Sequence, residues 1–334
     1  MTYAYPFSAI VGQENMKLSM ILAAIDPKIG GVLVFGDRGT GKSTAVRALS
    51  QLLPLIDVIE GCPINAARTE DVPSWHSGPL GQVVQRATPV VDLPLGVSED
   101  RVTGALDIER ALIDGQKQFQ PGLLAQANRG FLYIDEINLL EDHIVDLLLD
   151  VAQSGENVIE RDGLSIRHPA RFVLIGSGNP EEGDLRPQLL DRFGLSVEVG
   201  TPQTIEDRVE VIRRRDAYET DQEAFGQTWA PADQEVQTAI TQAQGRIADL
   251  PASDDILGLC AQICIELGSD GLRGELVLLR ASRALAAYDG AAEVMPAHIR
   301  RIAPMALGHR LRRDPLDEAS ATARVKRSLD AVFQ

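Results

Sequence analysis

The feature that most constrains the fold of this chain is a glycine-rich stretch of eight residues, Gly36-Asp37-Arg38-Gly39-Thr40-Gly41-Lys42-Ser43. It directly follows the apolar run Val32–Phe35 and opens a helical pattern that Thr44 continues. This spacing, set between a strand and a helix, is typical of a loop whose backbone N–H groups surround the phosphates of a nucleotide. We expect Lys42 to neutralise those phosphates and the Ser43 hydroxyl to bind Mg²⁺.

Short apolar runs alternate with helical patterns through the first 200 residues. The runs are Val32–Phe35, Val90–Leu93, Phe131–Ile134, Phe172–Ser177 and Leu195–Val199, and the helical candidates between them are Gly41–Leu53 and Ile144–Gln153. Nearly uninterrupted apolar runs suit strands that are buried on both faces of a parallel sheet. The alternation therefore predicts an α/β domain built on a parallel sheet.

Two stretches interrupt this alternation. Asn157–Pro169 has β-compatible flanks around Asp162-Gly163, a strong tight-turn signal, and predicts an inserted β-hairpin. Cys62–Arg101 is rich in proline, glycine and polar residues and shows no periodicity, so we expect a loop-rich insertion.

The strand-like runs end at Pro202, and the rest of the chain has helical patterns. The expected helices are Ile205–Arg215, Gln234–Ala248, Asp254–Leu267, Arg273–Tyr288 and Ala297–Arg312, separated by breakers such as Pro231, Pro251 and Pro296. We predict an α/β nucleotide-binding domain over residues 1–202, a helical linker region over 203–250 and an all-α C-terminal domain over 251–334.

Charge and composition disfavour several classes of protein. A net charge of −16 argues against a protein whose main task is to hold a nucleic-acid backbone, because that affinity depends on Lys and Arg. No stretch approaches the roughly 20 apolar residues that a membrane span needs. The beginning of the sequence lacks a secretory-signal pattern, so we expect a cytoplasmic protein. Cys62, Cys260 and Cys264 lack metal-binding spacing and are expected to be packing thiols.

Two basic clusters qualify the acidic balance. They are Arg208 with Arg213–Arg215, and Arg300–Arg301 with Arg310, Arg312 and Arg313. We interpret both as solvated helix faces, with subunit contacts as the next alternative and nucleic acid as the last.

A pair of adjacent acids ends one of the predicted strands. Asp135 and Glu136 follow the apolar run Phe131–Ile134. Together with the phosphate loop, this pair predicts hydrolysis as well as binding: Asp135 would hold Mg²⁺, and Glu136 would act as general base toward water.

Three further polar residues are ambiguous from the sequence alone. Asn179 could position water beside the γ-phosphate or be a turn residue before proline. Arg192 could reach a neighbouring subunit's nucleotide as an arginine finger or form a surface ion pair with Asp191. Arg273 could touch the same phosphates or be an ordinary arginine at a helix start.

With these residues placed, the chain resembles AAA+ ATPases over nearly all of its length. Longer stretches resemble one family, the smaller ATPase subunits of magnesium chelatase. They are Val11–Glu14, Gly36–Thr44, Asp92–Arg101, His143–Val151, Gly178–Gly194 and Gly268–Glu275. The segment from Asn65 to Val84 matches the family pattern least well.

The resemblance implies an α/β nucleotide domain with an insertion and a β-hairpin, followed by a displaced helical domain. It implies that Val11 and Gly12 join the phosphate loop in binding ATP, and that Mg²⁺ is bound by Ser43 and Asp135. The implied catalytic set is Lys42, Glu136 as base, Asn179 as first sensor, Arg192 as finger and Arg273 as second sensor.

The resemblance also implies a motor rather than the metal-inserting site. In the family, this subunit forms hexameric rings with a larger AAA+ related subunit, and ATP hydrolysis drives a porphyrin-binding subunit that inserts Mg²⁺ into protoporphyrin IX. The sequence itself suggests no porphyrin site, because aromatic residues make up only 4% and histidines are few. The alternatives are a related motor with other cargo, such as a cobalt-chelatase motor or a MoxR-like chaperone ATPase, and a nucleic-acid motor.

Overall fold

All five apolar runs are strands of one sheet in the computed structural model, which describes residues 4–106, 118–161, 164–183, 185, 187–269, 271–311 and 321–333. The strands are β1 (Val32–Gly36), β4 (Val90–Leu93), β7 (Gly130–Ile134), β10 (Phe172–Gly178) and β11 (Leu195–Val199). Their order is β11-β1-β10-β7-β4, and the pairs β1 with β11, β10 with β7, and β4 with β7 are parallel. The predicted α/β class is confirmed, and burial of β7 and β10 along their whole length explains their unbroken apolar sequences.

By packing, the chain divides into two compact units, one of Met1–Leu52 with Gly178–Gln334 and one of Leu53–Ser177. The domain boundaries predicted from the sequence, at residues 202 and 250, stay a prediction. The helices of the first unit are α1 (Glu14–Ile25), α2 (Lys42–Leu52), α7 (Pro187–Arg192), α8 (Ile205–Thr220), α9 (Gln222–Arg246), α10 (Asp254–Glu266), α11 (Arg273–Tyr288), α12 (Pro296–Leu307) and α13 (Ala321–Val332). Short 3-10 turns are η1 (Phe7–Ala9), η2 (Pro27–Ile29), η5 (Pro180–Glu182), η6 (Ile247–Asp249) and η7 (Gly308–Arg310).

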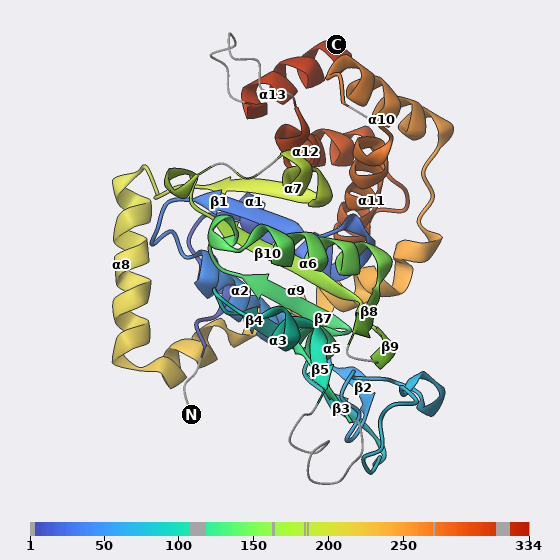
Figure 1. Cartoon of the computed structure of the whole chain (residues 1–334). Helices are drawn as coiled ribbons and strands as arrows, with labels where there is room; N and C mark the ends of the chain where they lie inside the picture. Colours follow the sequence, from blue (N-terminus) through green and yellow to red (C-terminus); the bar gives the residue numbers. More distant parts are fainter. Residues whose placement is uncertain are drawn as a thin grey trace. The chain divides into compact units, whose positions relative to one another are not determined.

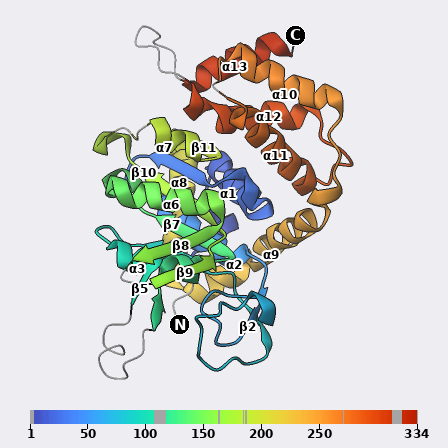
Figure 2. The ribbon, with the colours of Figure 1, turned by 45° about the vertical axis from the view of Figure 1, so that its right-hand side comes forward.

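The helical end of the first unit packs α11 against α12, and α10 and α12 against α13 (Figure 1 and Figure 2). Cys260 and Cys264 lie one turn apart inside α10, where burial raises the pKa of Cys260 to about 11 and that of Cys264 to about 12. Cys62 is also buried, so the prediction of packing thiols is confirmed.

Helix α9 begins well before its predicted start, because Pro231 does not break it. The Asp221 side chain caps the helix by accepting the Ala224 N–H at 2.9 Å. Phe225 in the first turn packs against Tyr218 of α8, and Trp229 one turn later packs against Phe225. These contacts hold the early turns although proline removes one N–H donor from the helix.

Helix α12 ends at Leu307, earlier than the predicted Arg312, which lies outside the described residues. The 3-10 turn η7 follows it. Its residues His309 and Arg310 bond through their side chains to backbone carbonyls of another segment, which fixes the chain in this tighter turn.

The second unit contains the insertion and the hairpin. Its strands outside the main sheet are β2 (Ile56–Ile59), β3 (Val83–Arg86), β5 (Gly104–Leu106), β6 (Phe119–Pro121), β8 (Glu156–Arg161) and β9 (Leu164–Pro169). Its helices and 3-10 turns are α3 (Glu99–Thr103), α5 (Leu123–Ala127), α6 (Asp142–Ser154), η3 (Thr69–Asp71) and η4 (Ile137–Leu139).

Strands β8 and β9 pair antiparallel and confirm the predicted hairpin, although its turn, Asp162-Gly163, lies outside the described residues. Strand β2, just before the predicted insertion, pairs antiparallel with β3 inside it, and periodicity did not predict this pair. All four residues of β3 are exposed, so no apolar alternation marks this strand in the sequence.

Candidate functional site

The phosphate loop joins β1 to α2 in the first unit, as the sequence predicts. Gly39 and Gly41 have φ values of +79° and +85°, a backbone conformation that glycine adopts readily and other residues rarely do. Helix α2 begins at Lys42, so its N-terminal N–H groups and positive dipole end lie at the loop. This combination of turned backbone and helix N-terminus is a site for an anion.

Lys42 lies across the loop on backbone carbonyl groups. Its amine donates to the Gly36 carbonyl, to the Asp37 carbonyl at 3.2 Å and to the Gly178 carbonyl at 3.3 Å. Gly178 is the last residue of β10, so Lys42 connects the loop with the end of that strand. Arg38 pairs with Glu182 and makes a second connection in the same direction.

Asn179 follows β10 directly, beside the lysine contact at Gly178. Its side chain is buried, and its Oδ1 accepts the Glu181 N–H at 3.1 Å as the cap of η5. The turn role considered from the sequence is therefore present. The sensor role stays a prediction, and the structure does bring Asn179 to the strand end that Lys42 contacts.

The remaining predicted nucleotide-binding residues of this unit lie in the loop, in the first turn of α2 and just before α1. Thr40 donates through its hydroxyl to the Asp37 carbonyl at 2.9 Å, which tightens the loop. Ser43 and Thr44 lie half-buried in the first turn of α2. Val11 is half-buried and Gly12 exposed, just before α1. Their neighbour Gln13 donates to the Gly200 carbonyl at 2.8 Å, next to the end of β11.

The second unit holds the paired acids at the end of β7. Asp135 Oδ1 accepts hydrogen bonds from the Ser177 hydroxyl at 2.5 Å and from the Tyr133 hydroxyl at 2.9 Å. Two neutral donors therefore fix the orientation of this carboxylate. Sequence reasoning missed both. The signals were present, because Tyr133 lies at the end of β7 only two positions before Asp135, and Ser177 ends an apolar run.

Glu136 has a left-handed backbone, with φ 54° and ψ 55°. This conformation is uncommon for a residue with a side chain and is concentrated at functional positions. The Glu136 N–H donates to the Ser177 hydroxyl oxygen at 3.2 Å. Ser177 thus links both acids, and it holds the turn in which the chain leaves β7.

Arg192 and Arg273 are brought together elsewhere in the first unit. Arg192 is half-buried at the end of α7, and Arg273 is the first residue of α11. Arg273 Nη2 donates to the Arg192 carbonyl at 2.9 Å, and its Nη1 lies 3.9 Å from Asp191 Oδ2. The structure therefore shows Arg273 supporting the backbone at Arg192.

The donor set fits a magnesium nucleotide. Backbone N–H groups and Lys42 suit phosphate oxygens, whereas Ser43 and Asp135 supply the hydroxyl and carboxylate oxygens that Mg²⁺ prefers. The fit rests on the turned glycines of the loop and on the fixed Asp135 carboxylate.

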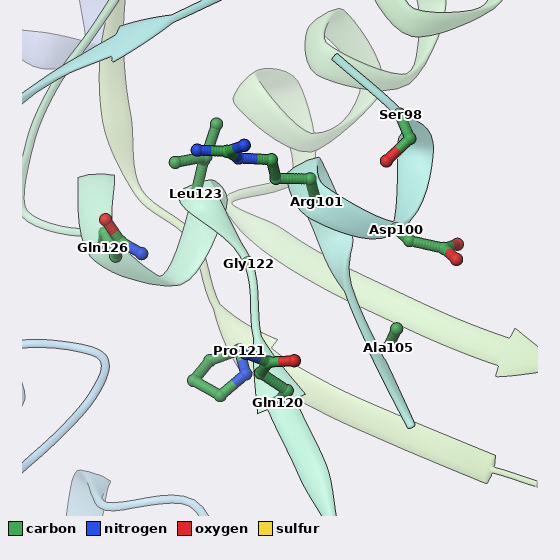
Figure 3. A pocket seen from close by; sticks show the side chains of 9 residues that line it. All are labelled: Ser98, Asp100, Arg101, Ala105, Gln120, Pro121, Gly122, Leu123 and Gln126. Carbon is green, nitrogen blue, oxygen red and sulfur yellow. The ribbon is translucent and has the colours of Figure 1, made fainter. Parts of the chain in front are cut away.

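A separate cavity of about 510 Å³ lies in the second unit and contains none of the predicted site residues (Figure 3). Its lining includes Asp100 and Arg101 of α3 and Gln126 of α5. It is not part of the nucleotide site.

The phosphate loop, the paired acids on a parallel sheet and the helical C-terminal region define the class: the chain is a P-loop ATPase of the AAA+ type. A family model described as AAA lid domain matches residues 258–328. The structure of a putative ATPase from Cytophaga hutchinsonii, 16% identical, matches with a TM-score of 0.66 over 98% of this chain and 91% of that chain. At that identity the match shows the fold alone.

Within that class, a family model described as magnesium chelatase, subunit ChlI, matches residues 107–188. The magnesium-chelatase 38 kDa subunit of Rhodobacter capsulatus is 67% identical, over 98% of this chain and 94% of the relative. That of Cereibacter sphaeroides is also 67% identical, over 98% of both chains. The chain belongs to the family of magnesium-chelatase 38 kDa subunits, which are subunits of an ATP-dependent chelatase.

A solved structure of the complex between subunits BchI and BchD of magnesium chelatase contains a chain that is 64% identical to this one. It matches with a TM-score of 0.58 over 96% of this chain and 99% of that chain. Among the helices of the described residues, none is long and apolar enough to cross a membrane.

Proposed function

We propose that this chain is the ATP-hydrolysing motor subunit of magnesium chelatase. It drives insertion of Mg²⁺ into protoporphyrin IX at a separate porphyrin-binding subunit, in chlorophyll or bacteriochlorophyll synthesis. One observation carries the proposal: Lys42 spans the loop carbonyls at the N-terminus of α2, in a chain that belongs to a chelatase family. The Mg²⁺ that enters the porphyrin is a substrate and is distinct from the ion bound with ATP.

In this proposal the loop N–H groups and Lys42 bind the phosphates of ATP, and Ser43 and Asp135 hold its Mg²⁺. When bound, that ion neutralises charge on the phosphates. Glu136 takes a proton from the attacking water, and Asn179 orients that water. The parallel pairing of β10 with β7 supports the proposal, since loops that follow neighbouring parallel strands leave the sheet at the same edge.

We further propose that the subunits assemble into a ring, a hexamer in the simplest case, and that Arg192 reaches the nucleotide of the adjacent subunit. Arg273 acts as second sensor. The partners are a larger AAA+ related subunit and the porphyrin-binding subunit. The complex of BchI with BchD supports the first of these partners. The cytoplasmic localisation is part of the same proposal.

Reconstitution tests the proposal directly. This protein, ATP, Mg²⁺ and protoporphyrin IX are mixed with the two partner subunits, and Mg-protoporphyrin is followed by its fluorescence. We expect product only when all three proteins and ATP are present. Formation of Mg-protoporphyrin by this chain alone would contradict the motor function. Steady ATP hydrolysis without product in the full mixture would favour a motor for another cargo.

A further inference from the structure

The carboxyl end of α7, which carries Arg192, is held by side chains from the helical end of the same unit. Three successive backbone carbonyls are involved, those of Asp191, Arg192 and Phe193. A helix leaves its last carbonyls without partners inside the helix, so such groups need donors from elsewhere. Here the donors come from α11 and η7.

Arg310 makes most of these contacts. Its Nη1 donates to the Asp191 carbonyl at 2.8 Å and pairs with the Asp191 carboxylate, and its Nη2 donates to the Phe193 carbonyl at 2.6 Å. Its Nε donates to the Ala306 carbonyl of α12 at 3.0 Å. The side chain is only 3% exposed. The interpretation of Arg310 as part of a solvated basic face is therefore wrong.

His309 adds a neutral donor to the same carbonyl. Its Nε2 lies 3.1 Å from the Phe193 carbonyl oxygen, so this nitrogen carries the proton. Burial, together with the nearby charges of Arg310 and Arg273, lowers the pKa of His309 to about 3. The ring is thus uncharged at neutral pH, and it adds no further positive charge beside the two arginines.

The two residues that follow Arg192, Phe193 and Gly194, are held in place as well. Phe193 is fully buried, and the Gly194 N–H donates to the Gly30 and Gly31 carbonyls at 3.3 and 3.2 Å. A Cβ on Gly194 would lie 2.0 Å from the Ile29 carbonyl oxygen, so the backbone is in close contact there. Arg192 lies between these fixed points, and its side chain is half-buried.

We propose that Arg310, supported by His309, is a positioning residue for Arg192: it holds the carboxyl end of α7 so that the Arg192 side chain is presented to the adjacent subunit. This inference rests on the proposed function of Arg192. A planar guanidinium with several donors suits the task, because it bonds three carbonyls and one carboxylate at once. Through these contacts with the backbone of α7, the helical region would affect catalysis in the neighbouring subunit. It would do so without contacting the nucleotide bound by its own subunit.

The test measures ATP hydrolysis of mixed subunits. Arg310→Gln keeps most of the side-chain volume and one amide donor, and Arg310→Lys keeps the charge. Alone, Arg310→Gln should lose at least tenfold in kcat while KM for ATP changes less than about threefold, since its own phosphate loop is intact. Arg310→Lys should recover part of the loss. Arg301→Gln is the matched control, an exposed arginine on α12 that should behave as wild type.

Mixing separates the possible roles of Arg310. Arg310→Gln mixed with Glu136→Gln should regain activity, because Glu136→Gln subunits offer a correctly held Arg192 to intact sites. Arg310→Gln mixed with Arg192→Ala should regain none. Recovery only in the mixture with Arg192→Ala would show that Arg310 acts on the nucleotide of its own subunit. No recovery in either mixture would show that Arg310 has only a structural role. Both outcomes overturn the proposal.

The reference mixture is Arg192→Ala with Glu136→Gln, with exchange of fluorescently labelled subunits confirmed in every case. If this reference recovers and Arg310→Gln with Glu136→Gln does not, the positioning role fails while the proposed function stands. If the reference itself stays inactive, the action of Arg192 on a neighbour is wrong, and the positioning role fails with it.

Discussion

The phosphate loop and the end of α7 both have backbone carbonyls that accept hydrogen bonds from a cationic side chain, and the two cations differ in role. At the phosphate loop, Lys42 is half-buried and reaches carbonyls only five and six positions away, besides Gly178. At the end of α7, Arg310 is buried and reaches carbonyls 119 and 117 positions away. We propose that Lys42 exchanges its carbonyls for phosphates when ATP binds, whereas Arg310 is buried among its partners.

Replacing Lys42 should therefore affect ATP binding, and replacing Arg310 should affect the stability of the fold. The largest effect is expected at Lys42. Lys42→Ala should weaken ATP binding by roughly 100-fold or more, because charge-assisted hydrogen bonds contribute about 1.5–3 kcal/mol each. Titration with a fluorescent nucleotide measures it, with exposed Lys28→Ala as control. Glu136→Gln should bind ATP normally and lose turnover. Near-normal hydrolysis by Glu136→Gln would show that Glu136 is not the base.

The free energy of unfolding should be affected more by replacing Arg310 than by replacing Lys42. Arg310→Ala should lower the free energy of unfolding by about 2–4 kcal/mol, since it breaks a buried charged contact while Asp191 stays half-exposed to water. Lys42→Ala should change it by less than about 0.5 kcal/mol, as for a surface substitution. Urea denaturation of both variants without nucleotide provides the comparison. Equal losses would mean that Lys42 is also a structural cation.

A third comparison concerns Asp135, the proposed Mg²⁺ ligand, and the two hydroxyl groups that donate hydrogen bonds to it. Ser177→Ala should raise the Mg²⁺ concentration for half-maximal ATPase activity roughly tenfold, because it frees the Asp135 carboxylate from its closest donor. Tyr133→Phe should have a smaller effect of the same sign. Ser50→Ala, a hydroxyl deletion on α2, serves as control. An unchanged Mg²⁺ dependence in Ser177→Ala would show that the Ser177 hydroxyl does not support a metal ligand.

The last expected effect concerns pH, and it is small for each pH unit. His309 has a pKa of about 3 in the folded chain, below its ordinary value near 6.5, so the unfolded chain binds more protons between these values. Stability should therefore rise with pH across this window and fall on acidification, by on the order of 1 kcal/mol per pH unit below about pH 6. His309→Gln should reduce that slope. The lowered pKa values of His168 and His298 leave a remaining slope in both proteins.

The difference between the two cations also explains what the sequence could predict. The phosphate loop and the five sheet strands are local patterns, because their spacing and apolar runs are determined by immediate neighbours. Arg310 has no such pattern, since its burial depends on α7 folding back beside η7. A cluster of arginines in a sequence does not reveal whether its side chains are exposed to water or bonded to buried carbonyl groups.

Other missed features follow the same rule. Pro231 predicted a helix break, but side-chain packing over several turns outweighed the loss of one N–H donor. Strand β3 is exposed and carries no alternation, so only its pairing with β2 defines it. The sequence pattern marks Ser177 only as the end of a strand, because its bond to Asp135 joins residues 42 positions apart.

The central claim is that this chain hydrolyses ATP at sites shared between adjacent subunits, and subunit mixing tests it most directly. Arg192→Ala and Glu136→Gln, each inactive alone, are mixed in equal amounts, with exchange confirmed by a fluorescent label. About one half times one half, or a quarter, of the interfaces should then hold both residues. We predict hydrolysis above that of both parents, up to roughly a quarter of the wild-type rate. A rate that stays at the level of the parents at every mixing ratio would contradict the claim, because it would confine Arg192 to its own subunit.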